Sequence, residues 1–269
     1  MKLLFSEARS DYAHYIFPYS IWGFPEPGET PADLFNAGFL PSSRQLDRFY
    51  LCRQLRVALA GFKPSSENRR ILRKGEGIRC KLLPRAEFEF SAARRTFCKS
   101  YADARFGDNV MSDERLDSLF HSPVTNHVLV FTDAATGAEV GIVTLYLEAG
   151  RVVFYYYAFY DLTHPNRSLG LFMMTTAVQV FAERGFQHVY LGTCYSEAAL
   201  YKAQFAGVEL FNGFKWSGNL AELKHLIARD QTEIREHLLE NEAFRKEFHQ
   251  SDINALAALS SFQVPLKKG

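Results

Sequence analysis

One turn of the chain concentrates residue types that bind anions. It lies between an uncharged run at residues 152–160 and an apolar helical run that starts at Leu171. Arg167 can form two hydrogen bonds to a phosphate, Ser168 is a favoured N-cap residue, and Gly170 lets a ligand approach the backbone. Because the first turn of a helix presents free N–H groups and the positive end of its dipole, this turn predicts a phosphate site. The alternative is that Ser168 only caps the helix and Arg167 is solvated.

The elements around this turn follow from periodicity. Residues 152–160 are uncharged and rich in β-branched and aromatic types, which predicts a strand buried on both faces. Apolar residues at helical spacing from Leu171 to Phe181 predict a helix of about sixteen residues that Gly185 ends. Residues 188–191 then predict a second strand and residues 197–205 a shorter helix. The order is strand, turn, helix, strand, helix.

A basic segment precedes this unit. Between Arg44 and Arg79 the only acids are Asp47, Glu67 and Glu76. A Pro-Ser-Ser turn there predicts the start of a short helix, whose basic residues are Arg69, Arg70, Arg73 and Lys74. The cluster favours a surface for an RNA or DNA backbone, and the alternative is a solvated charged face. The net charge of +1 argues against nucleic-acid binding driven by the charge of the whole protein, so any such binding must come from a local basic patch.

The composition is that of a well-packed globular protein, with 269 residues, 47% hydrophobic residues and 24 phenylalanines. The four cysteines (Cys52, Cys80, Cys98 and Cys194) are scattered and form no C-x-x-C pair, so neither a metal site nor a disulfide framework is predicted. The residues MKLLFSEARS do not show the pattern of a signal peptide, and no apolar run reaches about 18 residues. We therefore expect a cytoplasmic protein with reduced thiols.

The remaining segments predict further elements. Residues 11–29 combine aromatics with prolines, which predicts an ordered but irregular arm. A short helix is expected over residues 31–36, with Thr30 as its cap and Pro31 at its first position. Alternating apolar positions in 39–62 predict one or two strands, and residues 86–120 are helical in pattern in two pieces. Residues 127–147 alternate around Gly137, which predicts a β-hairpin. Accessory helices are expected from Asn219 onwards.

This order of elements is typical of an acyltransferase fold of the GNAT class. We therefore expect an α+β protein with a mixed central sheet flanked by helices. Three parts are predicted: an aromatic and basic region over residues 1–85, a GNAT-like catalytic domain over 86–218, and a helical extension over 219–269.

Five stretches together resemble the arginyl- or leucyl-tRNA–protein transferase family, the aminoacyltransferases of the N-end rule. They are FNAGFLPSSRQLDRFYLCRQLRV, FKPSSENRRILRK, FYDLTHPNRSLG with its following helix, RGFQHVYLG, and YKAQF, within residues 15–216. The resemblance implies transfer of an amino acid from its tRNA to the N-terminus of a protein. The chain departs from the family in having no N-terminal cysteine cluster such as C-G-Y-C, and Cys52 stands nearly alone.

The resemblance implies a reaction in which an amine attacks the ester that joins the amino acid to the tRNA 3′ end. Arg167 and the backbone of residues 168–170 would hold the terminal phosphate, and the helix from Arg69 to Lys74 would follow the acceptor stem. Because the ester is already activated, positioning and proton transfer can supply much of the acceleration. Aminoacyl-tRNA is then a co-substrate, no cofactor or metal is expected, and the partners are tRNA and an acceptor protein, with no membrane.

Four further residues gain candidate roles from this resemblance. Asp161 could orient or deprotonate the incoming ammonium group, or it could only form an Asx turn. Tyr195 and Tyr201 could protonate the leaving oxygen or stack on the terminal adenine, or they could be packing residues. Lys202 could contact phosphate, or it could be an exposed helix residue.

Other functions remain open at this point. The element order alone also fits an acyl-CoA-dependent N-acyltransferase, although HPNRSLG lacks the Q/R-x-x-G-x-G/A pattern that cradles the pyrophosphate of coenzyme A. The acceptor could be a small molecule instead of a protein, and the missing cysteines fit a non-catalytic tRNA- or protein-binding relative. No sequence feature assigns the amino acid that is carried.

Overall fold

The computed structural model describes residues 1–262 with the exception of Tyr12, His14, Tyr15, Asn109, Arg167, Ser251 and Ser261. The predicted phosphate ligand Arg167 therefore lies outside the described residues. No helix in the described part of the chain is long and apolar enough to cross a membrane.

The strands of the large sheet run in the order β12 (Trp216–Ser217), β11 (Val208–Phe211), β5 (Gln54–Ala58), β10 (His188–Thr193), β9 (Val152–Tyr160), β8 (Glu139–Glu148), β7 (His127–Asp133) and β6 (Ile78–Pro84). The pair β9 and β10 is parallel, and the other neighbours are antiparallel. The expected α+β fold with a mixed central sheet is therefore confirmed. The hairpin, the central strand, the long helix and the next strand also follow one another as the sequence predicts, which is the GNAT-like order.

A smaller antiparallel sheet has the order β1 (Lys2–Glu7), β2 (Tyr19–Phe24), β4 (Phe49–Leu51) and β3 (Phe39–Pro41), with α1 (Pro31–Asn36) between β2 and β3 in the chain. The expectation of an irregular arm over residues 11–29 is wrong for β2. Its residues pair along their whole length with β1, a partner that local composition does not reveal. The one or two strands expected in 39–62 are three, divided between the two sheets.

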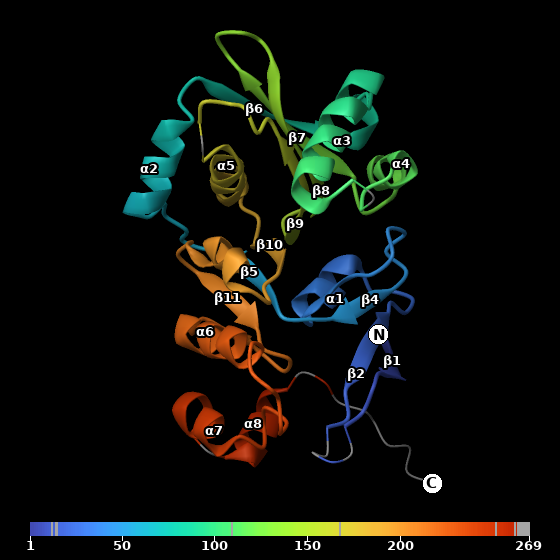
Figure 1. The fold of residues 1–269 in the computed structure, drawn as a ribbon, viewed down its shortest axis with the longest axis vertical. Helices are drawn as coiled ribbons and strands as arrows, with labels where there is room; N and C mark the ends of the chain where they lie inside the picture. The colour runs from blue at the N-terminus through green and yellow to red at the C-terminus, as the bar shows by residue number, and fades with distance from the viewer. Residues whose placement is uncertain are drawn as a thin grey trace.

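Helices cover both faces of the large sheet (Figure 1). Their bounds are α2 (Ser66–Lys74), α3 (Ala92–Phe106), α4 (Asp113–His121), α5 (Leu169–Glu183), α6 (Leu220–Arg229), α7 (Glu242–His249) and α8 (Ile253–Leu259), with 3-10 turns η2 (Arg85–Glu87) and η3 (Glu197–Ala203). Helices α2 and α5 pack on one face of the sheet and share one hydrophobic core, and α3 and α4 pack on the other face and share a second core. The helix expected at 197–205 is the 3-10 turn η3.

The predicted boundary at residue 85 falls just after β6. The large sheet nevertheless takes both β5 and β6 from the segment before that boundary. The three-part division of the chain stays a prediction.

Candidate functional site

The central feature of the large sheet is the place where its two parallel strands separate. β9 and β10 pair only from Val152 with His188 to Phe154 with Tyr190. Beyond that pair β9 continues to Tyr160 and stays paired with β8, while β10 continues to Thr193 and stays paired with β5. The sheet therefore opens at this point into a crevice.

Two β-bulges lie at the level where the strands separate. On β9 the register with β8 skips Tyr156, and on β10 the register with β5 skips Leu191. Gly192, next to the second bulge, has φ +80°, a left-handed conformation that favours glycine. Since a bulge bends its strand and interrupts pairing, the two bulges account for the divergence of the strands.

The crevice holds a cavity of about 510 Å³ that is rich in tyrosine. Its lining comes from α3, β9, the start of α5, β10 and η3, and consists of Tyr101, Phe106, Tyr155, Tyr156, Tyr157, Ala158, Tyr160, Ser168, Gly170, Leu171, Met174, Leu191, Tyr201 and Lys202. No aspartate or glutamate is among these described residues. The residues Phe106 and Tyr201 are 43% and 49% exposed, so both can offer a ring to an incoming planar group.

The first turn of α5 forms one wall of the cavity. Ser168 is at the N-cap position but makes no side-chain hydrogen bond to the helix, so its expected capping role is wrong. The Asn166 carbonyl instead accepts a hydrogen bond from the Leu169 N–H at 3.0 Å. Gly170 is in close contact with Tyr160, because a Cβ at position 170 would lie 2.6 Å from the Tyr160 ring. Gly170 thus permits the close approach of the Tyr160 side chain, whereas the sequence predicted the close approach of a ligand.

Tyr201 and Lys202 reach the cavity from η3. The Lys202 ammonium donates a hydrogen bond to the Thr193 carbonyl at 3.0 Å, and burial lowers the pKa of Lys202. Lys202 is therefore not the exposed helix lysine of the alternative interpretation. Burial also raises the pKa of Tyr201, which keeps its hydroxyl protonated.

Asp161 does not line this cavity. Its Oδ1 accepts hydrogen bonds from the Thr163 N–H at 2.8 Å and the Thr163 hydroxyl at 2.7 Å, and these bonds lower the pKa of Asp161. This is the Asx turn of the alternative interpretation. The structure therefore separates Asp161 from Tyr201 and Lys202.

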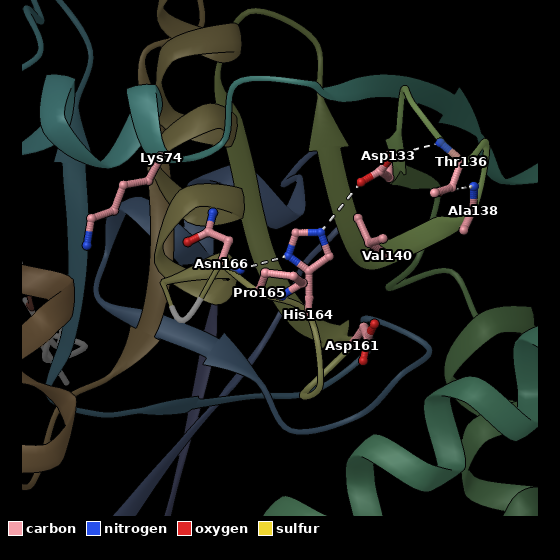
Figure 2. Close-up of a pocket in the computed structure, with 9 residues that line it drawn as sticks. All are labelled: Lys74, Asp133, Thr136, Ala138, Val140, Asp161, His164, Pro165 and Asn166. Atoms are coloured by element: carbon pink, nitrogen blue, oxygen red, sulfur yellow. Dashed lines mark hydrogen bonds and ion pairs between the residues drawn. The ribbon is translucent and has the colours of Figure 1, made fainter.

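Asp161 lines a neighbouring cavity of about 770 Å³ instead (Figure 2), together with Lys74, Asp133, Thr136, Ala138, Val140, His164, Pro165 and Asn166. His164 Nδ1 accepts a hydrogen bond from the Asn166 N–H at 3.1 Å, and its Nε2 lies 3.8 Å from Asp133 Oδ2. These contacts hold the loop that leads into α5. The second cavity therefore flanks the loop whose far end enters the tyrosine-rich crevice.

The predicted basic helix is α2, which packs against α5. Its four basic residues are exposed. Arg70 is paired with Glu67, and Arg69 donates to the Pro64 carbonyl at 2.7 Å. Arg73 and Lys74 thus present the positive charge of α2 most openly.

Tyr195 lies outside the crevice lining. Its hydroxyl accepts a hydrogen bond from the Arg53 N–H at 2.8 Å, and the Arg53 guanidinium lies 4.6 Å from its ring centroid. Arg53 also donates to the Cys194 carbonyl at 2.9 Å and pairs with Asp230. Tyr195 thus belongs to a network that ties the end of β10 to β5 and α6.

Comparison with known proteins identifies the segment that holds the crevice. Residues 94–212 match the family model described as the C terminus of arginine-tRNA-protein transferase. Over these residues the chain is similar to that family. Every described residue that lines the crevice, from Tyr101 to Lys202, lies in the matched range, whereas the basic helix α2 precedes it.

Curated proteins with transferase names also match the chain. The chain is similar to the aspartate/glutamate leucyltransferase of Ruegeria sp. (strain TM1040), with 31% identity over 174 residues, 62% of this chain and 61% of that protein. It is similar to the enzyme of the same name from Dinoroseobacter shibae, with 30% identity over 183 residues, 61% of this chain and 62% of that protein. The chain thus spans about three fifths of the length of the curated relatives it matches.

Solved structures resemble the chain only in part. The C-terminal domain of a putative lysylphosphatidylglycerol synthetase from Agrobacterium fabrum has a TM-score of 0.43 at 15% identity, over 53% of this chain and 46% of that chain. A GCN5-related N-acetyltransferase from Sphaerobacter thermophilus has a TM-score of 0.33 at 15% identity, over 65% of this chain and 50% of that chain. The fold assignment rests on the element order described above.

Several crevice residues in the matched range have no role in the sequence-based prediction. The sequence places Tyr155, Tyr156 and Tyr157 only in a buried strand, and Tyr101 in a structural helix. The usable signal is a run of tyrosines within an apolar strand, since each buried hydroxyl needs a partner. Arg105 also carries no sequence signal, and it contacts the Tyr160 hydroxyl at 3.4 Å beside the cavity.

Proposed function

We propose that the protein is an aminoacyl-tRNA–protein transferase. It moves an amino acid from the ester at the 3′ end of a tRNA to the N-terminal amine of an acceptor protein. The observation that carries this proposal is the family match over residues 94–212, because that range contains the described lining of the crevice. The names of the curated relatives support leucine as the amino acid and an N-terminal aspartate or glutamate as the acceptor.

The crevice also favours leucine over arginine. A buried guanidinium needs a carboxylate partner, and none is present among the described lining residues. Lys202 adds a positive charge that would repel an arginine side chain. Leu171, Met174 and Leu191 instead offer apolar surface to an aliphatic side chain.

In the proposed reaction the acceptor nitrogen attacks the carbonyl carbon of the ester. The C–N bond forms while the π electron pair of the carbonyl group moves onto its oxygen. When that pair returns, the C–O bond to the ribose breaks. The amine loses a proton and the ribose oxygen gains one. The contribution of the protein is to position the two substrates and to stabilise the negative charge that develops on oxygen.

The residues at the crevice divide these tasks. The Lys202 ammonium would hold the terminal phosphate, and Arg167 and the backbone of residues 168–170 stay predicted ligands of the same phosphate. In the free protein the N–H groups of Ser168 and Leu169 each donate to Asn166 at 3.0 Å, so a phosphate would have to displace these bonds to use them. The exposed Tyr201 ring would stack on the terminal adenine. Asp161 and Tyr195 do not line the crevice, and their catalytic roles stay predictions from the sequence resemblance alone.

The basic helix α2 would follow the acceptor stem. Arg69, Arg73 and Lys74 would contact its phosphates, and Arg70 would contribute less because Glu67 offsets its charge. Such contacts position the tRNA without reading its sequence.

The proposal is tested with the full chain and separately charged leucyl-tRNA and arginyl-tRNA. We expect labelled leucine to pass to peptides that begin with aspartate or glutamate, and not to matched peptides with a blocked N-terminus. Transfer of arginine alone would overturn the choice of amino acid. If no charged tRNA supports transfer to peptides or small amines, and calorimetry detects acetyl-CoA binding, the acyl-CoA alternative replaces the proposal.

A further inference from the structure

Tyr155 occupies the apex of the crevice. It is the first residue of β9 beyond the last pair with β10, and it directly precedes the bulged Tyr156. Its side chain lines the cavity and is 5% exposed. The ring is thus fixed by packing in the α5-side core at the point where the two strands separate.

The Tyr155 hydroxyl is buried and has no hydrogen-bond partner in the part of the chain that the structure describes. Tyr190 on β10, which pairs with Phe154, shows the usual arrangement in the same sheet. The Tyr190 hydroxyl donates to Asn36 Oδ1 at 2.7 Å and accepts from Arg56 at 3.3 Å. Buried hydroxyls are nearly always paired, so an unpaired one beside a cavity calls for an explanation.

The hydroxyl of Tyr155 can serve only as a neutral donor or acceptor. Burial raises the pKa of Tyr155 well above its ordinary value, with smaller contributions from Tyr201 and Tyr101. It therefore keeps its proton over the whole working pH range and cannot act as a general base. A preorganised neutral donor suits an oxygen that becomes negative during a reaction.

We propose that the Tyr155 hydroxyl donates a hydrogen bond to the carbonyl oxygen of the aminoacyl ester as that oxygen becomes negative. This role rests on the proposed function. The acceptor nitrogen forms its bond to the carbonyl carbon, and the carbonyl electron pair moves to the oxygen that faces Tyr155. When the pair returns, the C–O bond to the ribose breaks, the amine proton is released and the ribose oxygen is protonated. Tyr155 keeps its proton throughout.

The test is Tyr155→Phe in the full chain, which removes the hydroxyl and leaves the ring in place. The kcat for transfer from leucyl-tRNA should fall by about 100-fold, as for the loss of one donor to a tetrahedral intermediate. KM for the tRNA should stay within about twofold, because the bond strengthens only in the transition state. A higher KM at unchanged kcat, or no change in either, would overturn the proposal.

The thermal midpoint separates this role from a structural one. Tyr155→Phe removes an unpaired buried hydroxyl, so Tm should stay within about 1 °C or rise. The control Tyr190→Phe removes a paired one, so Tm should fall by about 3 °C or more while kcat stays unchanged. A clear fall in Tm for Tyr155→Phe would reveal a partner in the free protein and overturn the proposal.

The two proposals fail in different ways. If the wild-type chain transfers no amino acid from any charged tRNA, the proposed function fails, and the ester role of Tyr155 fails with it. If the wild type is active and Tyr155→Phe equals it, only the role of Tyr155 is overturned.

Discussion

Gly170 and Tyr160 are in direct contact where α5 begins: a Cβ at position 170 would stand 2.6 Å from Cε1 and 2.9 Å from the hydroxyl oxygen of Tyr160. Tyr160 ends β9, and its ring packs 4.7 Å from that of Tyr101, measured between centroids. The missing side chain at position 170 therefore sets how closely the first turn of α5 approaches the strand. The width of the crevice depends on this contact.

Gly170→Ala should destabilise the protein, although alanine is the better helix former by about 1 kcal/mol. The added methyl group must displace the Tyr160 ring, and overpacking of this kind costs about 1–3 kcal/mol. We expect a lower Tm, and we expect the transfer rate to fall even at temperatures where the variant is fully folded. The control is Gly218→Ala, because the nearest atom to a Cβ there is 4.0 Å away. Equal Tm values for the two variants would contradict the contact.

Lys202→Met should lower kcat/KM for aminoacyl-tRNA by about 10- to 100-fold, since it removes a charge-assisted contact to phosphate. Burial lowers the pKa of Lys202, so its ammonium is lost at a lower pH than that of an exposed lysine. Activity should therefore fall as the pH rises through this lowered pKa. Lys202→Arg should move the fall to higher pH, and Lys224→Met on the exposed side of α6 should leave the profile unchanged. If the activity of Lys202→Arg falls at the same high pH as that of the wild type, the charge of Lys202 has no role in the reaction.

Arg73→Glu and Lys74→Glu should each weaken tRNA binding by about tenfold at low salt. Each removes a phosphate contact, so the slope of log K against log salt should shrink by about one. Filter binding over a salt series measures both quantities. Arg235→Glu serves as the control, because Arg235 lies far along the chain and is paired with Glu233. If all three variants lose the same tRNA affinity, binding depends on the net charge of the protein and not on α2.

The protein should lose stability as the pH falls below about 6.5, the ordinary pKa of histidine. Burial lowers the pKa of His249, whose Nε2 lies 3.3 Å from Glu222 Oε1 between α7 and α6. The folded state thus binds fewer protons than the unfolded state, so stability is present above the unfolded pKa and declines towards the folded pKa. Urea unfolding at pH 7.5 and 5.0 measures the decline. His249→Phe should reduce this pH dependence, and an unchanged dependence would exclude His249 as its source.

Dense local patterns determine several elements of the site. Residues 152–160 are a strand because uncharged β-branched and aromatic residues fill it, and β9 has the predicted bounds. The apolar spacing after Ser168 likewise determines α5, which ends before Gly185. The type and order of these elements depend on neighbours in the sequence, so the sequence alone determines them.

Only the tertiary structure decides which of these residues meet. Tyr195 and Tyr201 are equivalent in the sequence, yet Arg53, the residue before β5, contacts Tyr195 in a network outside the crevice. Lys202 faces inward because the Thr193 carbonyl accepts its hydrogen bond. The bulge at Tyr156 interrupts the pairing of the tyrosine run with β8, and next to it the Tyr155 hydroxyl has no partner among the residues that the structure describes. Register, bulges and buried partners arise from pairing between distant strands, and a pattern of adjacent residues carries no information about such pairing.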